Sequence, residues 1–586
     1  MQARRPSIIP SASEPETLAR GTERIGGTVR LDNGRELAST LGLPGNAPVA
    51  DVLVAGWRAW GHDLAERLRG VFAFALHDPA TSEIYLARDV FGVAPLFLAR
   101  DGGEIVVSHS SRSVRQHCSF SCTMNEAMIA DFIKDEVTNK DETFFNEISR
   151  LPPGCWLSVT PQGERTERYW SMSAVPRNVE WPDAASRFRE LFDQSVARCH
   201  VEGDTALLLS GGLDSSAILA SLSAQQLLRP RSAVFSMTYR QSAGWGDGRH
   251  LDALRDAFDL DVHDLASDGH DPLMDIGDHL AALDGPYLSY GHSVSFRLQK
   301  AAAAAGFGHV LSGHGGDEIV SYGVGRLNEL ARQGRWLALW REARGAALLH
   351  HRPRWQSALP YLAHVGRLRK PVQRIGARLL PVADGAGAQQ PDLAPALAER
   401  VGGGRSWPPA PHRRSDHDDR MLQEWALDAP LQAKALEVFA VTSRAVGVHT
   451  AMPFYDRDLV ELTLSLPSHH KLRDGQTRAI VRQAMAGRLP PSVLQRADKF
   501  DFALAFKQGL LKDQDRLREL TGPANRKLDE FANRKRLDAI WAGVERHGAN
   551  IGIMDAFMLW RAAVLALWLE MSADNIDRKL TVGQSK

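Results

Sequence analysis

The residues Leu208-Leu209-Ser210-Gly211-Gly212-Leu213-Asp214-Ser215-Ser216 form the most informative stretch of this chain. The apolar run before Ser210 predicts a short buried strand over residues 205–209, and the residues that follow predict a helix over 215–222. The two glycines between them allow the backbone to approach a bound anion closely. Because the N–H groups at a helix start and the helix dipole favour negative charge, the stretch predicts a phosphate cradle. It is not a Walker loop, since Gly-x-x-x-x-Gly-Lys-Ser/Thr does not occur in the chain.

The composition of the 586 residues is typical of a globular enzyme, with 44% hydrophobic and 24% charged residues. Lys and Arg together number 70, as do Asp and Glu, and this balance argues against nucleic-acid binding, which needs a basic field. Four cysteines and no secretory signal indicate a reducing, cytoplasmic location. The helical pattern over residues 553–571 contains Asp555, Arg561 and Glu570, which favours a packed helix over a membrane span.

The pattern of apolar segments divides the chain into three parts. Residues 1–24 are polar and predict a flexible N-terminus. Residues 25–175 predict a β-rich domain, whereas long helical periods alternate with isolated strands over residues 180–586, which indicates an α/β domain with a parallel sheet. The predicted strands lie at residues 71–76, 83–87, 104–108, 233–237 and 309–311, and a helix is expected near residues 50–69.

A basic and aromatic segment interrupts the second domain at about residues 326–378. It contains many arginines together with Trp336, Trp340 and Trp355, and it predicts a helical insertion. The stretch that follows, at about residues 381–411, is rich in Pro, Gly and Ala and predicts a flexible loop. Two interpretations of the insertion stay open at this point: a solvated helical surface, or a docking face for a peptide or a partner protein.

Several further motifs accompany the phosphate cradle. The stretch Ser210-Gly211-Gly212-x-Asp214-Ser215 resembles the pyrophosphate loop of the ATP pyrophosphatases, which cleave ATP to AMP and pyrophosphate. The other motifs, in chain order, are Ala87-Arg88-Asp89-Val90-Phe91-Gly92, Ser312-Gly313-His314-Gly315-Gly316-Asp317, Pro453-Phe454-Tyr455-Asp456 and Arg496-Ala497-Asp498-Lys499. In this order the motifs resemble the asparagine synthetase superfamily over nearly the whole chain. The resemblance implies an α+β N-terminal nucleophile hydrolase-like sandwich followed by an α/β ATP pyrophosphatase domain, like that of the adenine nucleotide α-hydrolases.

The first domain departs from the glutamine-using members of this superfamily. Those members have a Cys directly after Met1, whose thiolate attacks the glutamine amide with its own α-amine as the base. This chain has Gln2 at that position, and its first cysteine is Cys118. The resemblance therefore implies an inactive glutaminase-like domain over residues 25–175.

The second domain departs from asparagine synthetases at positions that bear on the substrate. His314 stands where those enzymes usually have Glu in the Ser-Gly-x-Gly motif. His449 and Ala451 stand where they have the Glu and the Arg of a Glu-x-Arg-x-Pro-Phe signature. With the basic insertion and the missing glutaminase cysteine, these departures make the chain most similar to a lasso peptide cyclase.

A lasso peptide cyclase is an ATP-dependent macrolactam synthetase. The resemblance implies that an Asp or Glu side chain of a leader-free ribosomal precursor peptide is adenylated with loss of pyrophosphate, and that the peptide's N-terminal amine then displaces AMP. It also implies two partners, a leader peptidase and a leader-binding protein. Two alternatives stay open: a small-molecule amide ligase, which makes asparagine from ammonia or closes a β-lactam, and a non-catalytic scaffold.

The resemblance also assigns roles to residues, with ATP and Mg²⁺ as the implied cofactors. Asp214 and Asp317 are hard oxygen ligands for Mg²⁺ at predicted strand ends, where open α/β sheets bind ligands. Lys499 resembles the family lysine that stabilises negative charge, while His314 and His449 are candidate general bases because imidazole titrates near neutral pH. The residues expected to bind the nucleotide are Leu209, Ser210, Gly211, Gly212, Asp214, Ser215, Ser216, Phe235, Ser236, Met237, Gly313 and Gly315.

Overall fold

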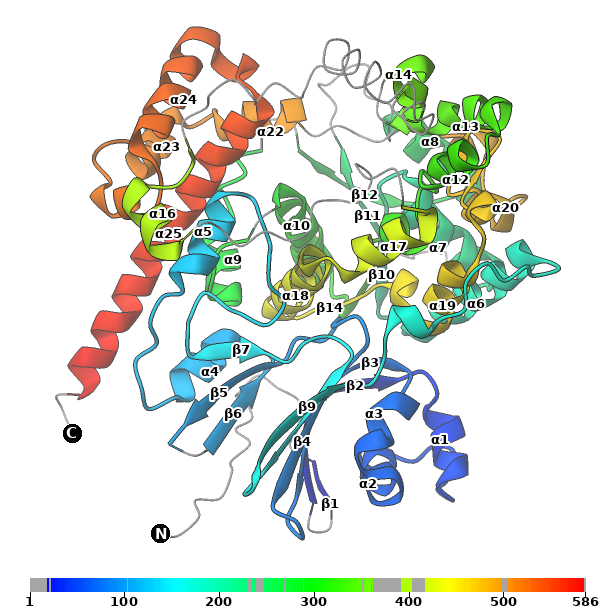
Figure 1. The fold of residues 1–586 in the computed structure, drawn as a ribbon, viewed down its shortest axis with the longest axis horizontal. Helices are drawn as coiled ribbons and strands as arrows, with labels where there is room; N and C mark the ends of the chain where they lie inside the picture. Colours follow the sequence, from blue (N-terminus) through cyan, green and yellow to red (C-terminus); the bar gives the residue numbers. More distant parts are fainter. Residues whose placement is uncertain are drawn as a thin grey trace.

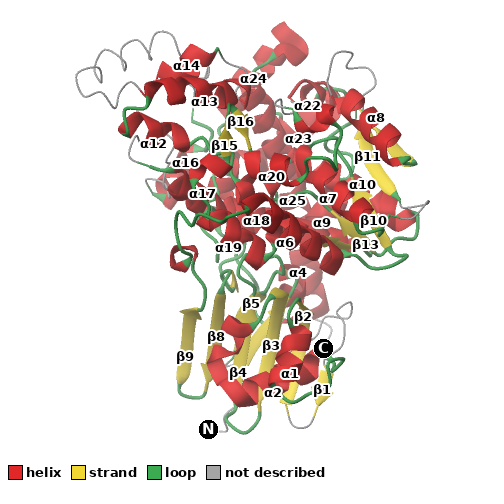
Figure 2. Cartoon of the chain, turned by 90° about the vertical axis from the view of Figure 1, so that its right-hand side faces the viewer, coloured by secondary structure: helices red, strands yellow, loops and turns green. Residues whose placement is uncertain are grey.

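The computed structural model arranges the chain as a β-sandwich beneath a larger, mostly helical body (Figure 1; Figure 2). It describes residues 18–20, 23–102, 104–228, 233–238, 247–267, 270–287, 289–349, 353–359, 361, 391–402, 417–496 and 503–583.

The N-terminal domain contains two antiparallel sheets. The larger sheet has the strand order β1-β2-β3-β4-β8-β9, and the smaller one has the order β6-β5-β7. The strands of the larger sheet are β1 (Leu18–Arg20), β2 (Glu23–Leu31), β3 (Gly70–Asp78), β4 (Glu83–Arg88), β8 (Cys155–Thr160) and β9 (Gly163–Arg168), and those of the smaller sheet are β5 (Phe97–Asp101), β6 (Glu104–Ser108) and β7 (Ile148–Arg150).

Apolar side chains on both faces of β3 explain why one face of the larger sheet packs on helices and the other on the smaller sheet. Phe72 and Phe74 point to the outer face of the larger sheet, where they pack in one cluster with residues of the neighbouring helices. Val71 and Ala73 point the other way, into a cluster shared with Leu98 of the smaller sheet. The helices of this domain are α1 (Gly34–Thr40), α2 (Val49–Trp60) and α3 (Leu64–Arg67) on the larger sheet, and α4 (Ser111–His117) and α5 (Glu126–Ile133) beside the smaller one. This order of layers confirms the predicted sandwich.

The second domain is built on a five-stranded parallel sheet with the order β12-β11-β10-β13-β14. It confirms the predicted α/β domain with a parallel sheet. Leu207 faces a cluster formed with α6 and α7, whereas Ala206 and Leu208 face α10. The elements are β10 (Thr205–Leu208), β11 (Val234–Thr238), β12 (Val262–Ala266), β13 (His309–Leu311), β14 (His449–Ala451), α6 (Ala184–Cys199), α7 (Leu213–Ala224) and α10 (Tyr290–Ala304).

Helices make up most of the remaining described chain. The long C-terminal helix α25 (Ile553–Gly583) buries Trp560 and Trp568 against its neighbours, as the packed-helix prediction expects. Within the described residues, none of the helices combines the length and the apolar character needed to cross a membrane. The other α-helices are α8 (Asp247–Phe258), α9 (Ile276–Leu283), α11 (Gly316–Val320), α12 (Arg326–Arg332), α13 (Trp336–Leu349), α14 (Arg354–Ala358), α16 (Pro395–Val401), α17 (Asp419–Asp428), α18 (Pro430–Ala445), α19 (Arg457–Ser465), α20 (Ala479–Ala484), α21 (Pro491–Leu494), α22 (Ala503–Leu510), α23 (Gln514–Thr521) and α24 (Arg534–His547).

Two predictions of flexible chain need correction. Within residues 1–24, Leu18 to Arg20 form β1 by pairing with β2, while residues 1–17 lie outside the described residues. Within the expected loop at 381–411, residues 395–401 form α16, because Pro395 suits the first helical turn and Leu397 is fully buried. The rest of that loop lies outside the described residues, except 391–394 and 402.

The predicted helical insertion at 326–378 is present as α12, α13 and α14 as far as it is described, with most residues beyond 361 outside the described residues. It has a small core of its own, in which Leu327 and Leu339 pack with Leu472. Trp340 and Trp355 stay 47% and 43% exposed. The insertion thus combines a packed inner side with exposed aromatic groups.

Buried ion pairs join the two domains. Arg150 of β7 binds Glu437 of α18 through Nη2–Oε1 and Nε–Oε2 contacts of 2.9 and 2.5 Å. Arg115 of α4 binds Asp284, at the end of α9, at 2.6 and 2.9 Å. Burial alone would raise the pKa of the Glu437 carboxyl, but the charges of Arg150 and Lys434 outweigh it and lower the pKa to about 2.

Replacing the buried carboxylate of Glu437 should lower the stability of the folded protein. We expect Glu437→Gln to lower the free energy of unfolding by about 3–5 kcal/mol, because it leaves Arg150 buried without its counter-charge. The folded pKa lies below the ordinary value of 4.5, so this stabilisation is complete above pH 4.5 and disappears as the pH falls towards 2. Urea denaturation at several pH values measures both effects.

The matched control is Glu164→Gln, which breaks an exposed pair with Arg100. That variant should lose no more than about 1 kcal/mol. An equal loss in the two variants would contradict the role given to the buried pair.

Candidate active site

The predicted phosphate cradle is a sharp turn between β10 and α7. Gly211 has a φ of +69°, a conformation that favours glycine. The hydroxyl of Ser215 accepts a hydrogen bond from the Ser210 N–H at 3.2 Å, and the Ser210 hydroxyl accepts one from the Gly212 N–H at 3.3 Å. Gly212 is the N-cap of α7, and no side chain caps this helix, so its start is suited to an anionic ligand.

A second loop, residues 312–315, packs directly on this turn from the end of β13. A Cβ atom on Gly313 would lie 2.7 Å from the Ser215 backbone nitrogen. A Cβ on Gly316, the first residue of α11, would lie 2.4 Å from the carboxyl carbon of Asp214. The glycines of the second motif are therefore needed because the two loops touch, and this contact brings Asp214 and Asp317 together.

Arg478 bridges the two carboxylates. Its Nη1 atom lies 2.8 and 2.7 Å from the two carboxylate oxygens of Asp214 and 2.7 Å from Oδ1 of Asp317. All three side chains are largely buried, with 13%, 19% and 20% exposure for Arg478, Asp214 and Asp317. Burial opposes the guanidinium charge, but the two carboxylates outweigh it and raise the pKa of Arg478. No sequence motif marks Arg478 as a site residue, since it is an isolated arginine before a helix.

The arrangement of the two carboxylates also suits the implied Mg²⁺ ion. Oxygen atoms of Asp214 and Asp317 both contact one nitrogen of Arg478, so they are close enough to one another to bind a single ion, and carboxylate oxygens are the ligands that Mg²⁺ prefers. Asp214 and Asp317 therefore fit a Mg²⁺ ion, and the guanidinium of Arg478 opposes their negative charge.

A cleft of about 490 Å³ opens beside these loops at the carboxyl ends of β10, β11 and β13. Its walls come from the two loops, from α10 and from Phe439 of α18. His314 packs its ring 4.7 Å from that of Phe439. The predicted site residues that line this cleft are Leu209, Ser210, Gly212, Asp214, Ser215, Met237, Gly313, His314, Gly315 and Asp317.

His292 of α10 is a second residue that the sequence analysis missed. It lines the cleft, is only 9% exposed, and packs its ring 5.1 Å from Phe439 in an edge-on arrangement. Its Nδ1 is buried and has no hydrogen-bond partner among the described residues. Burial, with smaller contributions from His314 and His279, lowers the pKa of His292 to about 3, so the ring is neutral at neutral pH.

Four predicted nucleotide-binding residues do not line the cleft. Gly211 lies in the turn itself, where its carbonyl accepts a hydrogen bond of 3.1 Å from Arg496. Ser216 is fully buried in α7. Phe235 stacks on His263, with ring centroids 4.7 Å apart, and Ser236 is buried beside it in β11.

The two remaining catalytic candidates are His449, which lies away from the cleft, and Lys499, which lies outside the described residues. His449 is not near the cleft: it begins β14 and pairs with His309, which begins β13, so it lies at the amino-terminal edge of the sheet. Burial, reinforced by the nearby charge of Arg30, lowers its pKa to about 4. Lys499 lies outside the described residues, although Arg482 holds the chain just before it through a hydrogen bond of 2.8 Å to the Arg496 carbonyl.

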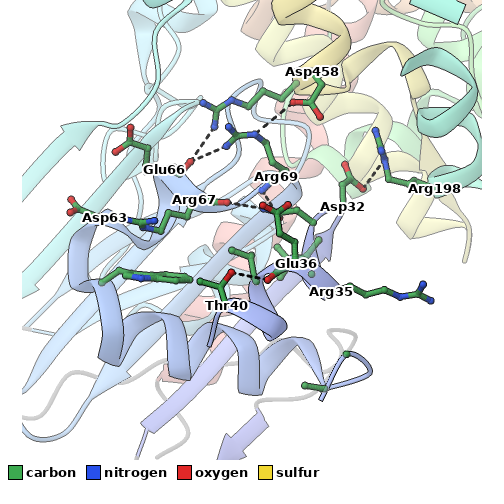
Figure 3. Close-up of a pocket in the computed structure, with 18 residues that line it drawn as sticks. Asp32, Arg35, Glu36, Thr40, Asp63, Glu66, Arg67, Arg69, Arg198 and Asp458 are labelled. Carbon is green, nitrogen blue, oxygen red and sulfur yellow. Dashed lines mark hydrogen bonds and ion pairs between the residues drawn. The ribbon is translucent and has the colours of Figure 1, made fainter. Parts of the chain in front are cut away.

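A larger cavity, of about 1130 Å³, lies in the first domain and its contact with the second (Figure 3). Its charged side chains face one another in pairs, such as Arg69 with Asp458 at 3.8 Å and Arg198 with Asp32 at 3.7 Å. No cysteine or histidine is among the described residues that line it.

The family of the chain follows from comparison with known proteins. The family model "Asparagine synthase" matches residues 187–570, and "Glutamine amidotransferase domain" matches residues 47–170. The chain belongs to the asparagine synthase family, which comprises ATP-dependent amide ligases.

Particular relatives are distant. A putative glutamine-hydrolyzing asparagine synthetase of Mycobacterium bovis is 26% identical over 87% of this chain and 79% of its own length. Asparagine synthetase 3 of Bacillus subtilis is 22% identical over 76% of this chain and 69% of its own. Among solved structures, a glutamine phosphoribosylpyrophosphate amidotransferase of B. subtilis matches 44% of this chain and 65% of its own, at 15% identity and a TM-score of 0.20.

The contact between the two loops can be tested by measuring stability. In Gly316→Ala, the added methyl group would press against the Asp214 carboxyl, and we expect a loss of about 1–3 kcal/mol in the free energy of unfolding. Thermal unfolding measures the loss, and the rise in Tm with MgATP should also be smaller than in the wild type. Gly277→Ala is the control, since a Cβ there meets nothing within 4 Å. Unchanged stability and nucleotide response in Gly316→Ala would contradict the tight packing.

Proposed function

We propose that this protein is an ATP-dependent macrolactam synthetase of the lasso peptide type. It adenylates an Asp or Glu side chain of a leader-free precursor peptide and joins it to the peptide's N-terminal amine, with release of AMP and pyrophosphate. The observation that carries this proposal is the pair of loops that places a phosphate cradle beside Asp214 and Asp317 at neighbouring strand ends.

The first half-reaction uses the turn after β10. A carboxylate oxygen of the peptide attacks the α-phosphorus of ATP, and the bond to the bridging oxygen breaks so that pyrophosphate leaves. Ser210, Ser215 and the start of α7 bind the phosphates through N–H and O–H donors, which stabilise the charge that grows on the leaving group. Asp214 and Asp317 would hold Mg²⁺, which would further neutralise that charge.

The second half-reaction forms the amide bond. The amine nitrogen attacks the acyl carbon, AMP leaves with its electron pair, and the nitrogen loses a proton. His314 lines the cleft and is the proposed proton acceptor, since imidazole suits this role at neutral pH. Lys499 remains the proposed residue that stabilises the negative charge of the tetrahedral intermediate.

The departures from asparagine synthetases in the second domain favour a peptide side chain over a free amino acid as the acyl donor. The motif position where asparagine synthetases have Arg holds Ala451 here. Val294, Leu298 and Phe439 add apolar surface, which suits a peptide.

A second candidate is asparagine formation from free aspartate and ammonia. The similar proteins from M. bovis and B. subtilis are named glutamine-hydrolyzing asparagine synthetases, which favours asparagine as the product, whereas Gln2 in place of the catalytic cysteine favours ammonia as the nitrogen source. Either function is consistent with a protein that works in the cytoplasm, which we also propose. A leader peptidase and a leader-binding protein are proposed partners only under the first function.

ATP–pyrophosphate exchange distinguishes the two functions. The purified chain with Mg²⁺ is assayed with free aspartate, with and without ammonium, and separately with leader-free synthetic peptides encoded by short genes beside its own. We expect exchange that depends on a peptide with an internal acidic residue, and a product that is one water lighter. Exchange with aspartate alone, or ADP as the nucleotide product, would overturn the proposal.

Asp317→Ala tests the proposed metal ligand. We expect exchange to fall at least about a hundredfold, because one of two hard ligands is lost while little core volume changes. The Tm should stay close to that of the wild type, since Arg478 keeps Asp214 as a partner. Asp538→Ala removes an exposed carboxylate on α24 and should leave both readouts unchanged. Full exchange in Asp317→Ala would rule out its assigned role.

A further inference from the structure

A cluster outside the cleft brings together two histidines and one glutamate from different parts of the second domain. His469 and His470 are neighbours in the short 3-10 helix η7 (Ser468–His470). Glu180 lies in the linker between β9 and α6, and its Oε2 is 3.9 Å from His469 Nε2 and 3.8 Å from His470 Nε2. One potential ligand atom from each residue lies within 4.8 Å of the others.

The linker holds Glu180 in place from both sides. The N–H of Val179 donates a hydrogen bond of 2.8 Å to the carbonyl of Ser465, and the indole N–H of Trp181 donates one of 3.3 Å to the Ser465 hydroxyl. These two hydrogen bonds to the last residue of α19 fix the chain on either side of Glu180.

His470 provides the observation that points to a ligand. Both of its ring nitrogens are buried, and neither has a hydrogen-bond partner among the described residues. The distance of 3.8 Å to Glu180 is too long for a hydrogen bond. Two such nitrogens on one ring, beside a second histidine and a carboxylate, can be satisfied by a bound ion.

The distances suit a metal ion between these atoms. Ligand bonds of about 2.0–2.2 Å, at tetrahedral angles, place two ligand atoms roughly 3.3–3.6 Å apart. The Glu180 oxygen and the histidine nitrogens are within a few tenths of an ångström of that spacing.

We propose that Glu180, His469 and His470 bind a transition-metal dication of the Zn²⁺ class. Two imidazoles and one carboxylate leave a fourth position for water. The nitrogen ligands distinguish this site from the all-oxygen pair of Asp214 and Asp317, which suits Mg²⁺.

The site would tie the linker to the segment that reaches the active site. Directly after His470, the Nζ atom of Lys471 is buried 3.3 Å from Asp419. The hairpin of β15 (Leu472–Arg473) and β16 (Gln476–Thr477) follows and leads to Arg478, the residue that bridges the two active-site carboxylates. An ion at the cluster therefore fixes the base of the hairpin that carries Arg478. This proposal does not depend on the proposed function.

Calorimetric titration of the metal-stripped full chain with Zn²⁺ tests the site. We expect one equivalent of tight binding in the wild type and a loss of at least about tenfold in affinity in Glu180→Gln and in His470→Gln. Glu180 is 69% exposed, so its replacement leaves the core intact and the test valid even if a histidine variant folds poorly. Mg²⁺ should not bind at this site, and an excess of Mg²⁺ should not displace Zn²⁺ from it.

His117→Ala is the matched control, because it removes an exposed histidine far along the chain from the cluster. It should bind Zn²⁺ as the wild type does. Thermal unfolding gives a second readout: Zn²⁺ should raise the Tm of the wild type and of His117→Ala but not that of Glu180→Gln. Equal binding and equal Tm shifts in all variants, or no tight binding in the wild type, would overturn the proposal.

Discussion

The contact of Arg478 with Asp214 and Asp317 is the interaction on which the site depends. Two carboxylates from neighbouring strand ends repel one another, and a buried cation between them holds both near one point. This arrangement needs glycine at position 316, since a side chain there would displace Asp214. The parallel sheet also brings Asp214 and Asp317 together, because they follow strands β10 and β13, which end at the same edge of the sheet.

Much of this organisation can be predicted from the sequence, because it depends on local chemistry. The turn after β10 and the helix after it follow from an apolar run, two glycines and a helix start, all within about a dozen residues. The sandwich of the first domain follows in the same way from alternation along strands such as β3. Asp214 and Asp317 lie directly after strands, so a shared sheet edge places them together.

Other features depend on contacts between distant residues and leave no local pattern. Arg478 reaches Asp214 across 264 positions of sequence, and His292 reaches the cleft from the middle of the domain. His449 is expected in the site but lies outside it. Its place beside a motif does not show that it begins the three-residue strand β14, at the edge of the sheet opposite the cleft. Residues 395–401 lie in a wider stretch rich in Pro, Gly and Ala that predicts a loop, but their own Ala, Leu, Glu and Arg favour a helix, and Leu397 is buried.

A structure of the full chain with Mg²⁺ and α,β-methylene-ATP, which cannot be cleaved between its α- and β-phosphates, would show where the nucleotide and the ion bind. We expect the β- and γ-phosphates against residues 210–216, the ion on Asp214 and Asp317, and the guanidinium of Arg478 on at most one of the two carboxylates. Nucleotide bound in the cavity of the first domain, or phosphates held away from this turn, would contradict this expectation.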